Sequence, residues 1–365
     1  MTRRILAVWT VVLFGLVSCV DQISFPLEKP KTKRLIVSGL FTDLNDTHIV
    51  FLSEATSQDR APVPSGGYLT LDDKPRPVRN ARVRLFSSTG NESWLYQEAR
   101  PGEYELKGDF VNKEGLSYYL EIQVEDRFYR SRVQTMPEYI GTDKLSFSFE
   151  RTRLDDNPDA AMAVIRSEVT LPEVNGGYYL RWAVEEAYFW DLTFFPNPFN
   201  TPPPNCIVFG YPEPERITRV NGDLLGRNSG KSTQIVAQRL VDQSFLSRHY
   251  FNVRQLSISK ETFDYWGKVS EVVNNTGSVF DTPPAPIRGN MYNVNDPNEV
   301  VLGYFEVAKA RITRIYTTAA DVPFFLEKEC LYQPNKPIDQ YLPSCLSCSF
   351  FPNSTTEYPE WWFDQ

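Results

Sequence analysis

The sequence has little of what enzymes most often use for acid–base and metal chemistry. It contains 2 histidines among 365 residues, His48 and His249, and both fall in strand-like stretches. It has no Gly-x-Ser-x-Gly elbow, no His-Glu-x-x-His and no phosphate-binding or dinucleotide-binding glycine motif. These absences leave no catalytic residue, metal ligand or cofactor to nominate, so we expect a protein that is not an enzyme.

Long apolar runs are also scarce. The run from Ile5 to Val17 is too short to cross the roughly 30 Å hydrocarbon core of a bilayer as a permanent helix. Arg3 and Arg4 precede it and Ser18-Cys19 follows, an order typical of a secretory signal. The segment resembles the lipobox of bacterial lipoproteins, in which Cys19 would be acylated and become the mature N-terminus. The alternative is an ordinary signal peptide over residues 1–18 with an incidental cysteine.

Positive charge is in deficit. The 38 Lys+Arg stand against 46 Asp+Glu, which gives a formal net charge of −8. This balance argues against a nucleic-acid partner and against a basic patch on a membrane surface. Attachment to a lipid bilayer would therefore depend on Cys19. Residues 19–34 hold two prolines and scattered charges without any period, so we expect a tether there.

Aromatic residues and proline, in contrast, are plentiful. The 19 Tyr, 24 Phe and 27 Pro favour strands and turns over helices. Between residues 35 and 140, short apolar stretches separated by turn signals are typical of a β sandwich. Residues 81–86 alternate Ala, Val and Leu with other side chains, two of them arginines, so one face would be buried. This region resembles the immunoglobulin-like and transthyretin-like modules of cell-surface proteins.

The rest of the chain, residues 141–365, reads as a larger β-rich domain. A closing pair of strands is expected at 300–307 and 310–316. One helix is expected at about 260–274, where Ser259 can cap the first turn. Its apolar residues recur at spacings of 3, 3 and 4, namely Phe263, Trp266, Val269 and Val273. The prediction is therefore an all-β chain with one helix packed over the second sheet.

Four cysteines remain after Cys19: Cys206, Cys330, Cys345 and Cys348. An even set in an exported protein favours disulfides. A metal at Cys345-x-x-Cys348 is the alternative, but no second pair or nearby histidine would complete a tetrahedral site. We expect two disulfides that tie a proline-dense loop and the C-terminal tail to the second domain. The sequence leaves three connectivities open.

Aromatic residues gather beside these cysteines, in the loop from Phe194 to Cys206 and in the tail from Ser349 to Gln365. The aromatic residues from Tyr178 to Phe199 exceed what one sheet face can bury, and exposed aromatic patches mark protein or sugar contacts. The alternative is that they belong to the core. We nominate five as partner contacts: Phe194, Phe195, Phe199, Trp361 and Trp362.

Several motifs together resemble one protein family. They are the strand Leu35 to Phe41, the helix start from Ser257 to Trp266, Arg288-Gly289-Asn290-Met291, Val301 to Phe305 and the late Cys-x-x-Cys. They resemble domain of unknown function 4249, a family of Bacteroidota lipoproteins. The resemblance implies a lipid-anchored outer-membrane protein, on the cell surface or the periplasmic face, beside a TonB-dependent transporter barrel. Ser349-Phe350-Phe351 departs from the basic and glycine residues of the family there.

Three functions are thus open. The first is a non-enzymatic envelope lipoprotein that accompanies an outer-membrane barrel. The second is a surface protein that binds a glycan or peptide on its own. The third is a hydrolase whose site no motif reveals.

Overall fold

The computed structural model describes residues 34–55, 63–65, 68–70, 75–88, 92–107, 115–152, 160–170, 177–195, 205–222, 231–274 and 286–363. The expected signal peptide, Cys19, nearly all of the tether and Phe199 lie outside these ranges. Contacts divide the chain into two units. The unit of residues 1–33 and 56–74 contributes one described antiparallel pair, β3 (Val63–Ser65) with β4 (Tyr68–Thr70). Every other element below belongs to the second unit.

The N-terminal strands form a two-layered sandwich, which we call the first sandwich. One layer holds β1 (Arg34–Thr42), β2 (His48–Ala55), β5 (Arg76–Pro77), β8 (Gln97–Arg100) and β9 (Glu103–Leu106). The other layer holds β6 (Arg82–Ser87), β7 (Ser93–Leu95), β10 (Ser117–Val124), β11 (Arg127–Ser131), β12 (Gln134–Thr135) and β20 (Met291–Asn293).

Strict alternation builds the core of the first sandwich. β10 buries every second side chain from Tyr118 to Val124. Val83 and Leu85 of β6 are buried with them, while Arg82 and Arg84 lie on the opposite face. Because side chains of a strand point alternately to its two faces, apolar residues at every second position fill one continuous core. The expected sandwich is confirmed.

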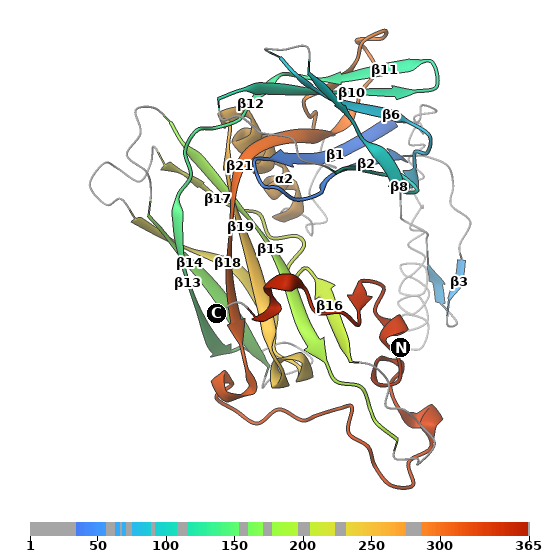
Figure 1. Cartoon of the computed structure of the whole chain (residues 1–365), viewed down its shortest axis with the longest axis vertical. Helices are drawn as coiled ribbons and strands as arrows, with labels where there is room; N and C mark the ends of the chain where they lie inside the picture. The colour runs from blue at the N-terminus through green and yellow to red at the C-terminus, as the bar shows by residue number, and fades with distance from the viewer. Residues whose placement is uncertain are drawn as a thin grey trace, which may run out of the picture. The chain divides into compact units, whose positions relative to one another are not determined.

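The strand β21 (Leu302–Thr317) connects this sandwich to the rest of the unit. Its first half pairs in parallel with β1, from Leu302 to Ala308. Its second half pairs antiparallel with β19 (His249–Ile258), from Lys309 to Thr317. Figure 1 shows the single long strand beside both partners. The expectation of two closing strands is wrong, because the break in the apolar pattern is a change of partner and not a turn.

Two glycines make this junction possible. Gly303 has a φ of +84°, a conformation that side chains with a Cβ rarely adopt, and a Cβ there would collide with the Val37 carbonyl of β1. A Cβ on Gly289 would collide with the carbonyl of Gly303. The glycines of the two quoted motifs thus allow the backbones to approach one another.

A second sandwich follows. One layer holds β15 (Tyr179–Trp190), β16 (Cys206–Gly210), β17 (Thr218–Asn221), β19, the second half of β21 and β22 (Ser354–Thr355). The other holds β13 (Thr142–Arg151), β14 (Ala161–Thr170) and β18 (Lys231–Leu240). Their shared core contains Ile165, Trp182 and Phe251. The domain boundary expected at residue 140 falls between β12 and β13, and β21 keeps both sandwiches in one compact unit.

The helix α2 (Lys260–Asn274) begins and ends where the sequence predicts. Phe263 packs on Tyr179 of β15, with ring centroids 5.0 Å apart. Trp266 donates its indole N–H to Glu306 of β21 at 3.0 Å, and the guanidinium of Arg181 lies over its ring. The expected packing of this helix on the second sheet is therefore confirmed. None of the described helices is long and apolar enough to span a membrane.

Candidate functional site

The C-terminal tail, residues 318–363, lies along β15 and β16. It contains short 3-10 turns: η3 (Ala319–Asp321), η4 (Ile338–Gln340), η5 (Pro343–Cys345), η6 (Cys348–Phe350) and η7 (Glu360–Phe363). In Figure 1 the orange-to-red tail leaves the end of β21 and returns beside β16. β22 pairs with β16, and the Thr193 N–H donates to the Cys345 carbonyl at 2.8 Å. The tail is therefore joined to the second sandwich by backbone hydrogen bonds.

Two disulfides add covalent ties. Cys206, the first residue of β16, pairs with Cys348, with Cα atoms 5.7 Å apart. Cys330 pairs with Cys345, with Cα atoms 5.1 Å apart. These pairs agree with the expected two disulfides and select one of the three connectivities. The first bond links the tail to the sheet across 142 residues, and the second closes a loop of 15 residues within the tail.

The end of the tail turns one tryptophan inward. Trp362 is 3% exposed and packs on Tyr250, with ring centroids 4.9 Å apart. The Tyr250 hydroxyl and the Arg248 guanidinium both donate to the Trp362 carbonyl, at 2.6 and 2.9 Å. This placement corrects the nomination of Trp362 as a partner contact, since its ring fills the cluster formed with Ala187 and Ile207.

The other nominated residues lie at different depths. Trp361 is half-buried between Tyr250 and the guanidinium of Arg314. Phe194 is 42% exposed. Phe195 is half-buried and meets Tyr341 of the tail edge to face, with centroids 5.1 Å apart. The loop that follows β15 and the tail therefore come together at Phe195, as expected. Phe199 falls in a stretch that the structure does not describe.

The outward side of the tail is rich in apolar residues, and we call these residues the tail patch. Of the 19 exposed large hydrophobic side chains in the described ranges, eight belong to the tail: Phe325, Leu331, Tyr332, Ile338, Leu342, Phe350, Tyr358 and Phe363. Phe325 is 90% exposed. Exposed large apolar side chains are thus concentrated on this segment of the described chain.

Sequence reasoning missed five of the eight residues of the tail patch. It began the partner contact in the tail at Ser349, whereas five members lie upstream: Phe325, Leu331, Tyr332, Ile338 and Leu342. The available signal was a stretch with apolar residues at irregular intervals between prolines and charges. Such a pattern fits neither a strand nor a helix, and so predicts an irregular segment.

A buried polar network lies beneath the tail. His249 donates or accepts hydrogen bonds at both ring nitrogens, to Glu186 at 3.0 Å and to Ser244 at 3.1 Å. Arg239 also binds Glu186, at 3.0 Å. Burial lowers the pKa of His249, so we assign a neutral ring that donates to the Glu186 carboxylate and accepts from the Ser244 hydroxyl.

The network contains a serine, a histidine and a carboxylate, which are the residue types of a hydrolytic triad. Ser244, His249 and Glu186 are all buried, however, so a substrate would not reach the serine hydroxyl in this arrangement. Their evident role is to hold η2 (Gln243–Leu246) against β15 and β19. His249 is thus a hydrogen-bonded residue of the sheet, in the strand-like stretch where the sequence places it.

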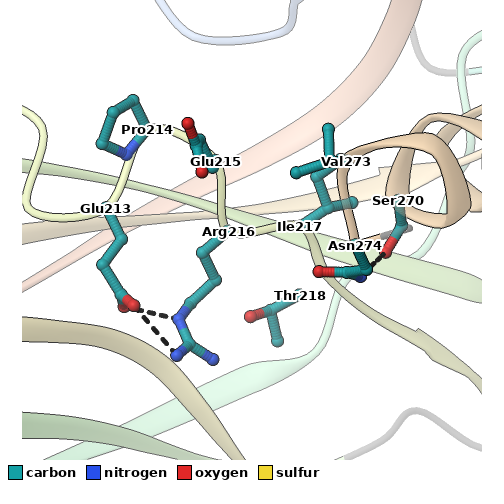
Figure 2. Close-up of a pocket in the computed structure, with 9 residues that line it drawn as sticks. All are labelled: Glu213, Pro214, Glu215, Arg216, Ile217, Thr218, Ser270, Val273 and Asn274. Carbon is teal, nitrogen blue, oxygen red and sulfur yellow. Dashed lines mark hydrogen bonds and ion pairs between the residues drawn. The ribbon is translucent and has the colours of Figure 1, made fainter. Parts of the chain in front are cut away.

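A cavity of about 540 Å³ opens between residues 213–218 and the end of α2. Figure 2 shows Glu213 bonded twice to Arg216, and Asn274 bonded to Ser270. Glu213 also accepts from the Gln238 N–H of β18. Glu213 and Arg216, which line the cavity, therefore fix the 213–218 segment to the sheet. Side chains engaged in this way are poorly suited to binding a ligand.

The family assignment comes from comparison with known proteins. The model of the family described as domain of unknown function (DUF4249) matches residues 20–314. The chain belongs to this family. No curated protein matches it. The DUF4249 match spans both glycine motifs and α2 but ends before the tail patch, and Cys330, Cys345 and Cys348 lie beyond it.

Proposed function

We propose that this protein is a lipid-anchored component of the cell envelope that performs no chemistry and binds a partner protein through the tail patch. The partner is a TonB-dependent outer-membrane barrel, and the anchor is the acylated Cys19 in the outer membrane. In chain order the first sandwich follows the anchor and precedes the tail patch.

The observation that carries the proposal is an exposed apolar surface on a covalently fixed segment. Phe325 and Phe363 face solvent, yet the segment between them is tied by two disulfides and by pairing with β16. Holding a loop in one conformation before binding lowers the entropy lost when a partner docks. Phe and Tyr supply large contact areas with few rotatable bonds. Both properties suit an interface.

The anchor is supported by the sequence. The apolar run from Ile5 to Val17 ends at Ser18-Cys19, and a tether follows it. A single acyl chain binds a membrane weakly, whereas two or more hold a protein stably. Replacing Cys19 by Ala is expected to move the protein from the membrane fraction to the soluble fraction. Unchanged fractionation of that variant would refute the lipid anchor while leaving the tail interface untested by this result.

The interface is tested by copurification of the full chain from native membranes, with mass spectrometry of the bound proteins. The double variant Phe325→Ser/Phe363→Ser is expected to lose a barrel protein that the unchanged chain retains. Phe51→Ser is the control, because Phe51 is also an exposed phenylalanine, at 50%, but lies on β2 of the first sandwich. Retention of the barrel by the tail variant, or its equal loss from the control, would contradict the proposal.

A further inference from the structure

A second surface, on the first sandwich, has the chemistry of a ligand site and does not depend on the tail patch. The outer faces of β6, β10 and β11 line a cavity of about 430 Å³, within the size range of small-ligand sites. We call it the arginine groove and define it by Arg82, Arg84, Phe86, Glu121, Phe128 and Arg130. Alternation along the strands, with the apolar core beneath, puts these side chains on one face.

Strand register sets their order. Arg84 of β6 lies opposite Glu121 of β10, which lies opposite Arg130 of β11. Glu121 accepts two hydrogen bonds from Arg130, from Nε at 2.9 Å and from a terminal nitrogen at 2.5 Å. The Glu121 carboxylate, in the middle of the row, is thus bonded to Arg130 of β11 and not to Arg84 of β6.

Two guanidinium groups of the groove remain without an anionic partner. Among the residues that the structure describes, neither Arg82 nor Arg84 forms an ion pair, and Arg84 Nε is buried without a hydrogen bond. The groove is therefore locally positive on a chain whose net charge is −8, which favours an anionic ligand.

Flat apolar rings lie beside these cations. Phe86 and Tyr119 stack at 5.1 Å with an interplanar angle of 7°, and the guanidinium of Arg130 lies over Tyr119. Phe128 is exposed at the other end of the groove. Arginine pairs with a carboxylate through two parallel hydrogen bonds, and a ring face packs on an apolar ring of similar size. The combination matches a ring that carries a carboxylate.

The topology argues against a bound peptide strand. β6 is paired on both sides, with β7 and β10, and β10 is paired with β6 and β11. A peptide that binds by strand addition needs an unpaired sheet edge, which the centre of this sheet does not offer. Contacts in the groove must come from side chains, as they do for small ring-shaped ligands.

We infer that the arginine groove binds a carboxylate-bearing sugar of an acidic glycan. Arg84, together with Arg82, pairs with a uronate carboxylate, and Phe86 and Phe128 contact sugar rings at the two ends of the groove. Glu121 keeps Arg130 in place beside them.

The test is titration calorimetry of the full lipidated chain in detergent with trigalacturonate as the probe. Its methyl ester has the same rings without the charge, and triglutamate has the charge without the rings. Arg84→Gln is expected to weaken trigalacturonate binding about tenfold or more, since a charged hydrogen-bonded pair is lost. Arg79→Gln, an exposed arginine of the same sandwich outside the groove, is expected to leave binding unchanged.

The inference requires that the acid binds, that the ester binds at least tenfold more weakly and that only the groove variant loses affinity. Absence of trigalacturonate binding would overturn it, as would equal affinity for acid and ester. Tighter, Arg84-dependent binding of triglutamate would assign the groove to acidic peptides instead. Thermal unfolding of each variant checks the fold, and Arg82→Gln replaces Arg84→Gln if the latter does not fold.

Discussion

The first sandwich and the tail keep their shape by opposite means. The sandwich has no disulfide among its described residues and relies on a core in which Val37, Leu85 and Leu120 are fully buried. The tail has almost no regular structure, yet two disulfides and one short strand hold it, and eight large apolar side chains face outward. Apolar residues stabilise the one region and are left available in the other.

The difference suggests a division of labour. A segment without a core of its own loses much conformational entropy when it is ordered, and cross-links reduce that loss by restricting the unfolded chain. Because cross-links supply the order, the apolar residues of the tail need not be buried. Apolar residues therefore form the core in the first sandwich, whereas in the tail they are free to contact a partner.

The largest expected loss of stability comes from a substitution in the core of the first sandwich. Phe305 of β21 is fully buried where the strand pairs with β1, so Phe305→Ala is expected to lower the free energy of unfolding by about 3–5 kcal/mol. Phe51→Ala on the exposed face of β2 should change it by less than about 0.5 kcal/mol. Urea denaturation of both variants checks the pair. Similar values for the two would contradict a core built by alternation.

Removing the two disulfides one at a time compares how much each of them stabilises the tail. In the chain-entropy account a loop of 15 residues contributes about 3 kcal/mol and one of more than 100 residues about 5 kcal/mol, with measured values usually smaller. Cys206→Ala/Cys348→Ala is therefore expected to destabilise more than Cys330→Ala/Cys345→Ala. Denaturation and limited proteolysis of the two double variants compare them. A larger loss of stability in Cys330→Ala/Cys345→Ala would show that native packing, and not loop length, determines how much each disulfide stabilises the chain.

Acid is expected to weaken the first sandwich through His48. Burial is the main cause that lowers the pKa of His48 to about 4, so the folded chain keeps it neutral while the unfolded chain protonates near pH 6.5. The unfolded state then binds more protons between these values, and stability falls as the pH falls from 6.5 to 4, by about 3 kcal/mol. His48→Gln should flatten this part of the pH profile of unfolding.

The same experiment has an internal control. Burial raises the pKa of Asp46, beside His48, which shifts stability in the opposite sense at acidic pH. Because Asp46 lies 3.7 Å from His48, the comparison of Asp46→Asn with Asp46→Asn/His48→Gln isolates the contribution of His48. A pH profile that the substitution leaves unchanged would show that His48 is not the group responsible.

Much of this fold was predictable because its signals are local. Alternation in residues 81–86 predicted which side chains of β6 are buried, and Ser259 with the apolar spacing predicted α2 at its observed bounds. The strand β21 was not predictable in this way. Its change of partner at Ala308-Lys309 depends on β1 and β19, which are remote in sequence. Local periodicity cannot report pairings of that range.

Prediction from the sequence was more limited for the tail than for the fold. Trp362 is buried and its neighbour Phe363 is exposed, although both belong to the same aromatic cluster at the end of the chain. Which of them turns inward depends on Tyr250 and Arg248, whose hydrogen bonds fix the Trp362 carbonyl. Composition predicted the cluster and the even cysteine count predicted cross-links. Neither could predict the direction of a side chain in a single turn of 3-10 helix.

The smallest effect on stability is expected on the outward side of the tail, and its smallness is informative. Ile338 is 62% exposed and makes little use of its apolar surface in the folded chain. Ile338→Ser should therefore change the free energy of unfolding by less than about 0.5 kcal/mol, the range of ordinary surface substitutions. If the tail patch is an interface, the same variant should still weaken retention of the partner from native membranes. Urea denaturation and copurification of one preparation measure both quantities. A stability loss of several kcal/mol would place Ile338 in a core, and the contrast between sandwich and tail would then fail at this residue.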